Sequence, residues 1–115
     1  MKDNIILEKS FEFALEIIKL YKVLLKNNEF VVSKQLLKSG TSIGANVEEG
    51  IAAQSRKDFI SKISIASKEA RETRYWLRLL DKSQFVDYNY SDQLAKVEEL
   101  VKLLTAIVKS SKSNV

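Results

Sequence analysis

The sequence lacks proline altogether and has only three glycines among its 115 residues. Turns draw heavily on these two residues, and a β-rich domain of this length needs many turns. The scarcity of both therefore indicates a few long helices joined by short connections. A chain of this length is expected to form one domain. We predict a single all-α domain over residues 1–115, an antiparallel up-and-down four-helix bundle.

Four segments carry apolar residues at helical spacing, and polar or small residues separate them. The first segment has two neighbouring apolar rows, one through Phe11 and one through Phe13, so we expect burial on more than one side. The third segment begins at Ser55 with a capping-box pattern in which Asp58 replaces the usual Glu. The predicted helices span residues 5–26, 32–52, 55–82 and 91–110.

Cysteine and histidine are both absent, which removes disulfides, the usual zinc sites, common haem ligation and Cys or His nucleophiles. Glu8, Glu12 and Glu16 form a carboxylate row on the first helix. Carboxylate metal sites in bundles also use Glu-x-x-His, so a solvated face is the better interpretation. The sequence has no nucleophile elbow and no phosphate-binding loop. We therefore expect no catalytic residue, no metal site and no cofactor.

The N-terminal residues MKDNIILEKSFEF contain no uninterrupted apolar core and no small-residue cleavage site, so no signal peptide is visible. No stretch approaches the ~20 apolar residues of a membrane span. These features predict a cytoplasmic protein without a membrane partner. The net charge of +4 and the pI near 9.3 permit an anionic partner without requiring one.

The second predicted helix has mostly small residues in its middle, from Ser39 to Ala45. Glycine inside a helix costs on the order of 1 kcal/mol relative to alanine. Because Gly40 and Gly44 share one face, we expect a neighbouring helix to approach closely there. A phosphate-cradling loop is the alternative, but no lysine follows in the P-loop arrangement and no strand precedes it.

Asn46 and Glu49 lie three residues apart and share a face of the same helix. We expect them to bond an arginine or a backbone group on the next helix, and we expect Gly50 to ease the chain out of the helix. A catalytic pair of Glu48 and Glu49 is disfavoured, because adjacent helical residues diverge by about 100°. The residues that we interpret as structural are Gly40, Gly44, Asn46, Glu49 and Gly50.

The third predicted helix carries the whole net charge of the protein. Residues 55–82 contain eight basic and four acidic residues, a sum of +4, so the rest of the chain sums to zero. A basic row with a tyrosine suits a nucleic-acid backbone, because Lys and Arg neutralise phosphates and an aromatic ring can stack on a base. The candidate nucleic-acid-binding residues are Arg56, Lys57, Lys68, Arg71, Arg74, Tyr75, Arg78 and Lys82.

A solvated face joined by ion pairs at helical spacing is the alternative interpretation of this basic row. Arg71, Arg74 and Lys82 have no acidic residue three or four positions away, so they must find partners on another helix, another subunit or a ligand. Arginine-rich helices also build subunit interfaces, and that interpretation stays open. The candidate pairs within the helix are Asp58 with Lys62, Lys68 with Glu72, and Arg78 with Asp81.

The segment from Thr41 to Gly50, TSIGANVEEG, resembles the hallmark segment of the 23S rRNA-intervening sequence protein family, generically called four helix bundle proteins. Its Asn-x-x-Glu-Gly core, formed by Asn46, Glu49 and Gly50, is fairly specific. The likeness covers most of the chain, because it continues through residues 55–59, 64–66, 68–73 and 75–80.

This resemblance implies a small up-and-down bundle that can assemble as a homopentamer. It also implies a relation to the accessory protein of diversity-generating retroelements, a basic, nucleic-acid-binding bundle that partners a reverse transcriptase. No enzymatic activity is attached to the family, and some members are encoded within insertions in ribosomal RNA genes. The chain departs from its relatives in a short first connection without proline near Asn28 and in a modest charge excess.

We therefore expect a non-enzymatic, oligomeric bundle that binds structured RNA or DNA through the basic row of the third helix. Contacts to the phosphate backbone would dominate, so sequence specificity should be low. The alternative is a protein–protein interaction or assembly module without nucleic-acid binding. In that case the apolar stripes form a ring, and Arg74 or Arg78 pairs with Glu49 or Glu72 across subunits.

Overall fold

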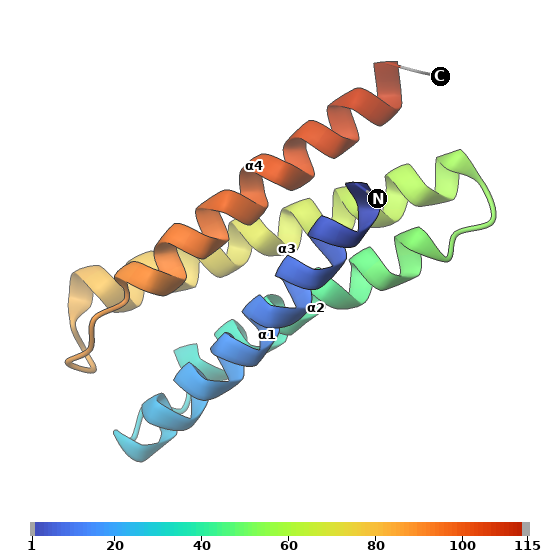
Figure 1. Ribbon diagram of the computed structural model, residues 1–115. Coiled ribbons are helices and arrows are strands. Elements are labelled where there is room, and N and C mark those ends of the chain that lie inside the picture. Colours follow the sequence, from blue (N-terminus) through green and yellow to red (C-terminus); the bar gives the residue numbers. More distant parts are fainter. Residues whose placement is uncertain (1, 114–115) are drawn as a thin grey trace.

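The computed structural model describes the backbone of residues 2–113 and the side chains of residues 5–113, and it contains four α-helices (Figure 1). These helices are α1 (Lys2–Lys26), α2 (Val32–Ile51), α3 (Arg56–Ser83) and α4 (Ser91–Ser113). No β-strand occurs in the described part of the chain. The predicted all-α four-helix fold is confirmed. Helices α1 and α4 extend past the predicted limits of residues 5 and 110, because no proline or glycine stops them there.

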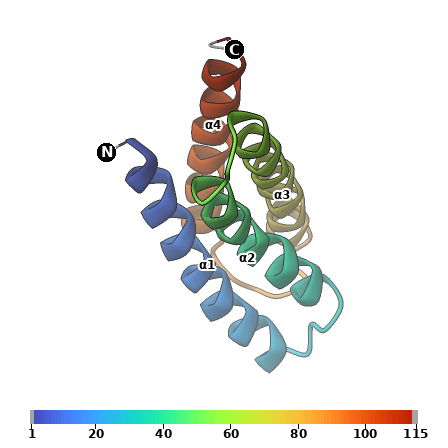
Figure 2. The same cartoon turned by 90° about the vertical axis from the view of Figure 1, so that its right-hand side faces the viewer.

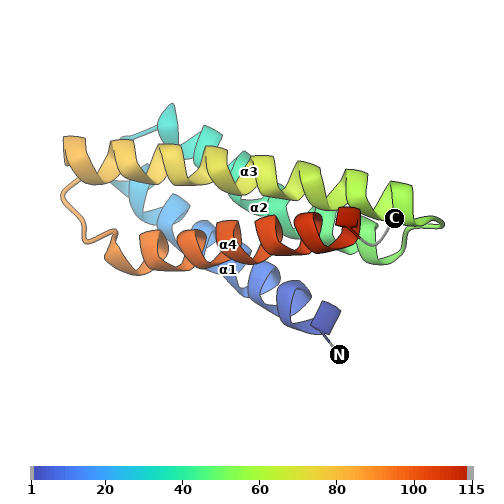
Figure 3. The same ribbon diagram turned by 90° about the horizontal axis from the view of Figure 1, so that it is seen from above.

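The helices pack in chain order around one core, with α2 between α1 and α3 and with α4 returning to α1 (Figure 2). Helices α1 and α3 are diagonal to each other, and their backbones do not approach closely among the described residues. The contact between α1 and α4 is the smallest of the four, and the N-terminal half of α1 diverges from α4 (Figure 3). The bundle measures 47 × 22 × 20 Å, so its long faces run along the helices.

One apolar row from each helix forms the core. The predicted seam of α3 is buried from Ile63 to Leu80. In α1 the row through Phe13 and Ile17 is buried, but Phe11 on the neighbouring row is 61% exposed. The expectation that α1 is buried on more than one side is therefore correct only in part, because Leu7, Ala14, Tyr21 and Leu25 of that row are half-buried. The helices that pack along α1 are α2 and α4, so its outermost apolar side chains stay exposed.

The glycines of α2 lie where neighbouring helices approach most closely. A Cβ atom on Gly40 would lie 2.9 Å from Cγ2 of Ile17 on α1, and a Cβ atom on Gly44 would lie 3.3 Å from the backbone oxygen of Ser10. These distances confirm the predicted close packing and identify α1 as the partner. Gly50 was expected to ease the chain out of the helix, but it is helical and no glycine in the described chain has positive φ. A Cβ there would lie 3.1 Å from Cδ1 of Ile63, so Gly50 brings α2 close to α3.

Side chains cap the N-termini of α2 and α3. The Ser55 hydroxyl accepts a hydrogen bond of 3.0 Å from the backbone N–H of Asp58, as the capping pattern of the sequence predicts. Before α2, the buried Glu29 carboxylate accepts hydrogen bonds from the backbone N–H groups of Val31, Val32 and Ser33. A negative charge at a helix N-terminus also interacts favourably with the helix dipole. Glu29 therefore fixes the connection between α1 and α2.

Candidate nucleic-acid interface

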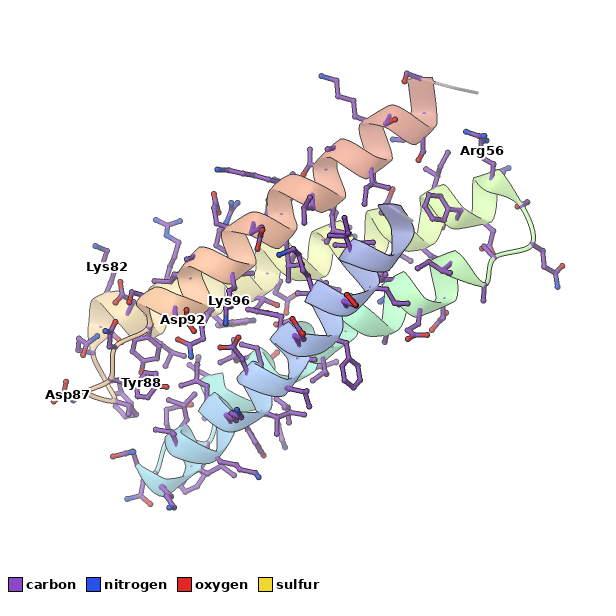
Figure 4. The ribbon with its side chains drawn as sticks, viewed as in Figure 1. Arg56, Lys82, Asp87, Tyr88, Asp92 and Lys96 are labelled. Carbon is purple, nitrogen blue, oxygen red and sulfur yellow. The ribbon has the colours of Figure 1, made fainter. Side chains whose placement is uncertain are left out.

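The basic row of α3 lies on the outside of the bundle. Lys57, Lys68, Arg71, Arg78 and Lys82 are all exposed. Tyr75, in the same row, is 54% exposed, and its ring packs edge-on against Trp76 with 5.1 Å between the centroids. Figure 4 shows Arg56 and Lys82 at opposite ends of α3, a separation of ~40 Å at 1.5 Å per residue. The row thus follows most of the long axis of the molecule.

Arg74 is the exception, because its side chain is half-buried and forms an ion pair with an acidic residue on another helix of the same chain. Its Nη1 donates to both carboxylate oxygens of Glu98 on α4, at 2.8 and 3.3 Å. This hydrogen bond holds the pKa of Glu98 below its usual value, and the charges of Arg74, Lys102 and Arg71 add to the effect. The partner that Arg74 lacks on its own helix is therefore on α4, and its guanidinium joins two helices.

Arg71 also reaches α4, where its Nη2 donates a hydrogen bond of 3.0 Å to Oγ1 of Thr105. One hydroxyl group does not neutralise a guanidinium, so Arg71 keeps its full charge at the surface. The single contact restricts the side chain to the groove between α3 and α4. Arg71 is therefore held in place while most of its donors stay available.

None of the three ion pairs expected within α3 forms between described side chains. Lys62, for example, was expected to bind Asp58, but its Nζ lies 3.1 Å from Oε1 of Glu49 on α2. The hydrogen bond to Glu49 raises the pKa of the Lys62 ammonium group. Gly50 explains why Lys62 pairs with Glu49. A Cβ at Gly50 would be only 3.3 Å from Cβ of Lys62, so α2 and α3 lie very close together there. The pairs Lys68 with Glu72 and Arg78 with Asp81 are likewise not formed within residues 5–113.

The expected roles of Asn46 and Glu49 are correct only in part. Glu49 does bind the next helix, but its partner is Lys62 and not an arginine. Asn46 bonds within its own helix, since its Nδ2 donates to the backbone oxygen of Ser42 at 2.8 Å. A carbonyl one turn back is always within reach of a helical Asn side chain, whereas the partner helix is not. The two residues therefore do not share one partner.

Helix α4 contributes three lysines that were not among the predicted binding residues, namely Lys102, Lys109 and Lys112. All three are exposed, and none forms an ion pair within residues 5–113. They continue the 4,3 spacing that starts with Glu98 and Thr105, so they share the side of α4 that faces α3. The sequence does show this cluster, because residues 102–113 contain three lysines and no acidic residue.

We call the combined surface of α3 and α4 the basic face. Glu98 is an acidic side chain at this face, and its carboxylate is bound to Arg74. The face is grooved, with two adjoining open hollows of ≈ 390 and ≈ 360 Å³ between the helices. Its members are Arg56, Lys57, Lys68, Arg71, Tyr75, Arg78 and Lys82 from α3 and Lys102, Lys109 and Lys112 from α4.

The outer side of α1 carries exposed apolar side chains among charged ones. Phe11, Leu15 and Ile18 are exposed by 61%, 47% and 37%. On its other side, α1 binds α4 through charged groups, since Lys96 bonds Glu16 and Lys9 lies 3.2 Å from Glu99. A wide hollow of ≈ 690 Å³ opens where α1 diverges from α4, with mostly apolar walls. Helix α1 thus offers an apolar surface without a partner in the described chain.

No cluster of three or more acidic, His or Cys side chains that could hold a metal ion occurs within the described residues. A bilayer span requires a long apolar helix. Within residues 2–113 none of the four helices has an apolar run sufficient to traverse a lipid bilayer.

Comparison with known proteins places the chain in a family. Residues 2–106 match the family profile described as 23S rRNA-intervening sequence protein. The chain is also similar to a crystal structure of a protein with unknown function from the S23 ribosomal protein family of Bacteroides thetaiotaomicron VPI-5482. The two are 51% identical, with a TM-score of 0.89 over 95% of this chain and 99% of that chain. No curated protein matches the sequence. The chain therefore belongs to the 23S rRNA-intervening sequence protein family.

Proposed function

We propose that this protein is a non-enzymatic bundle that binds structured RNA or DNA through the basic face. The observation that carries the proposal is the position of Lys102, Lys109 and Lys112. Lys109 and Lys112 line a groove together with Arg71 of α3, and Lys102 lies on the same side of α4. Glu98, on that side as well, is bound to Arg74. A two-sided cationic groove concentrates positive potential more than a single row on one helix does.

Binding through this face would depend on phosphates and not on base identity. Lysine and arginine release counterions when they neutralise phosphates, which makes the affinity salt-dependent and largely independent of sequence. Tyr75 is the one exposed aromatic ring in the basic face. Single-strand binders stack successive bases on several aromatic rings, so one tyrosine favours contact with the backbone. A nucleic-acid ligand of this kind implies a cytoplasmic setting.

The test is fluorescence anisotropy of a labelled structured RNA with the purified protein, across a salt series. The variant K102E/K109E/K112E should lower the affinity by at least ~100-fold at 50 mM salt. It should also reduce the log–log salt slope by roughly 0.7–0.9 for each phosphate that is no longer neutralised. The result expected for the wild type is binding that weakens steeply with salt.

The matched control is K19E/K22E/K26E, which makes the same change in net charge on α1. All three control lysines are exposed, and none forms an ion pair within residues 5–113. This variant should keep most of the affinity, because its lysines are outside the basic face. Equal loss of affinity in the two variants would mean that net charge alone drives binding. Absence of binding by the wild type at low salt would refute the proposal.

Self-assembly is a second candidate function, and the outer apolar side of α1 favours it. Exposed apolar side chains that gather on one side of a helix often mark an interaction site. A homo-oligomer, a pentamer by the family resemblance, would cover Phe11 and Leu15. We also propose a relation to the accessory protein of diversity-generating retroelements, with a reverse transcriptase as the protein partner. The TSIGANVEEG segment and the basic face support this relation.

A further inference from the structure

The two hollows of the basic face adjoin each other along the groove between α3 and α4. The end hollow is lined by Arg56, Lys57 and Ile60 of α3 and by Lys112 of α4. The middle hollow has one wall from α3 and one from α4, and no acidic side chain among the described residues lines either hollow. Lys112 is the residue that the two hollows share. The middle hollow is lined by Ser64, Ser67, Arg71, Thr105, Val108, Lys109 and Lys112.

The middle hollow has the chemistry of a phosphate site. Arg71 is held by Thr105 at 3.0 Å and uses one of its five donors there. A guanidinium fixed in this way loses little rotamer freedom when it binds a phosphate, and it can bind with two parallel N–H groups. Ser64 and Ser67 place hydroxyl groups on the same wall, and a hydroxyl can donate to a phosphate oxygen. Lys109 adds a second charge from α4.

The end hollow is more apolar than the middle hollow, although three cationic side chains line it. Arg56 and Lys57 come from the first turn of α3, where backbone N–H groups also favour an anion. Ile60 forms an apolar floor that a sugar ring can contact. Lys112 closes the hollow from α4 and separates it from the middle hollow. Five cationic side chains thus line the two hollows together, because Lys112 is common to both.

The distance between the hollows indicates whether a bound strand runs along the groove or across it. Their α3 walls are centred about ten residues apart, which is ~15 Å along the helix axis. One strand of a stacked nucleic acid advances ~3.4 Å per nucleotide, so the two hollows are spanned by about four or five nucleotides. A strand that crosses the groove would reach only one of them.

We infer that the groove between α3 and α4 binds one sugar-phosphate strand lengthwise, with phosphates in both hollows and Lys112 between them. This inference rests on the proposed function and adds the path of the strand and the minimum length of the ligand. The phosphates in the two hollows belong to one molecule, so the second contact forms at a high effective concentration. Affinity then depends on whether the strand is long enough to reach both hollows.

The experiment is a length series of fluorescein-labelled oligothymidylates of two, three, four, six, eight and ten nucleotides. Anisotropy is measured at 50 mM salt with the full chain. The wild type should show a step, with affinity rising more than tenfold between three and six nucleotides and only slowly beyond six. The variant K112Q should lose the step and bind the longer strands about tenfold more weakly.

The matched control is K26Q, because Lys26 is an exposed lysine in the last turn of α1, as Lys112 is in the last turn of α4. K26Q should keep the step and stay within twofold of the wild type. Circular dichroism melts confirm that both variants are folded. A further variant, S64A/S67A, should lower the affinity for the longer strands severalfold, since it removes two hydrogen-bond donors and no charge.

Two outcomes would overturn the inference while the proposed function stands. One is a smooth rise of wild-type affinity in proportion to length, which indicates diffuse attraction without fixed phosphate positions. The other is tight binding by the wild type together with the same dependence of affinity on strand length in K112Q and K26Q. If no oligonucleotide and no structured RNA binds the wild type at low salt, the proposed function itself fails.

Discussion

Arg74 and Glu98 join α3 to α4 in the middle of the basic face, and their pairing has a consequence for stability at low pH. The hydrogen bond from Arg74 keeps the folded-state pKa of Glu98 below the 4.5 of an unperturbed Glu. The folded protein therefore takes up this proton at a lower pH than the unfolded chain does. The stabilising contribution is fully present above pH 4.5 and is lost as the pH falls through the folded-state value.

Replacing Glu98 by Gln should accordingly lower Tm at pH 7, and the difference from the wild type should shrink as the pH approaches 3. Circular dichroism melts at several pH values measure this difference in Tm. The control is E48Q, which removes an exposed carboxylate that forms no ion pair within residues 5–113. Its Tm difference from the wild type should stay small throughout. A constant difference for E98Q down to pH 3 would contradict the assigned pairing.

The same pair marks the limit of what the sequence could predict about the site. The local spacing correctly left Arg71 and Arg74 without a partner on α3. The partners Thr105 and Glu98 are 34 and 24 positions away, and only the packing of α4 on α3 identifies them. Charge counting pointed to α3 because the three acidic residues in the first half of α4 reduce the net charge of that helix to +1. The lysines of its second half were therefore missed.

At the scale of the helices, Gly40 decides how closely α1 and α2 can pack. Alanine at this position gains about 1 kcal/mol of helix propensity. Its Cβ would lie 2.9 Å from Cγ2 and 3.3 Å from Cβ of Ile17, and overpacking of this kind costs about 1–3 kcal/mol. Since these Ile17 atoms are near its backbone, the side chain cannot simply swing away. We expect G40A to destabilise the protein by about 1 kcal/mol or more.

A double-mutant cycle tests this explanation. In the background of I17A both Cγ atoms are gone and only the 3.3 Å approach to Cβ remains, so G40A should become nearly neutral or stabilising by up to about 1 kcal/mol. Urea unfolding of the four proteins gives the coupling free energy. Equal effects of G40A in both backgrounds would place the close contact elsewhere.

The helices themselves could be predicted because one simple property, apolar spacing without proline, determines them. The cap at Ser55 and the close approach at Gly40 and Gly44 also follow from local patterns. The buried side of α1 could not be predicted, since the rows through Phe11 and Phe13 are equally apolar. Which row faces the core depends on where α2 and α4 lie. The cap from Glu29 was missed for a similar reason, because a polar break and a capping carboxylate look alike in sequence.

For the molecule as a whole, the exposed row on α1 predicts self-association. The variant F11D/L15D should convert the assembled protein into a monomer without unfolding it, because both side chains are about half exposed or more. Light scattering after size-exclusion chromatography gives the mass. The control is F30D/F85D, in the two connections, where the side chains are 59% and 72% exposed. A wild type that is monomeric at all concentrations, or equal effects of both variants, would contradict this role for α1.

Helices α1 and α3 are diagonal in the bundle, and their backbones do not come close within the described residues. An assembly built on the outer side of α1 would therefore leave each copy of the basic face uncovered. Every added copy brings another set of weak phosphate contacts within reach of the same nucleic acid. Linked weak contacts multiply in strength when the geometry lets them act together. The modest charge of one chain is thus no measure of how firmly an assembly would hold a long, folded RNA.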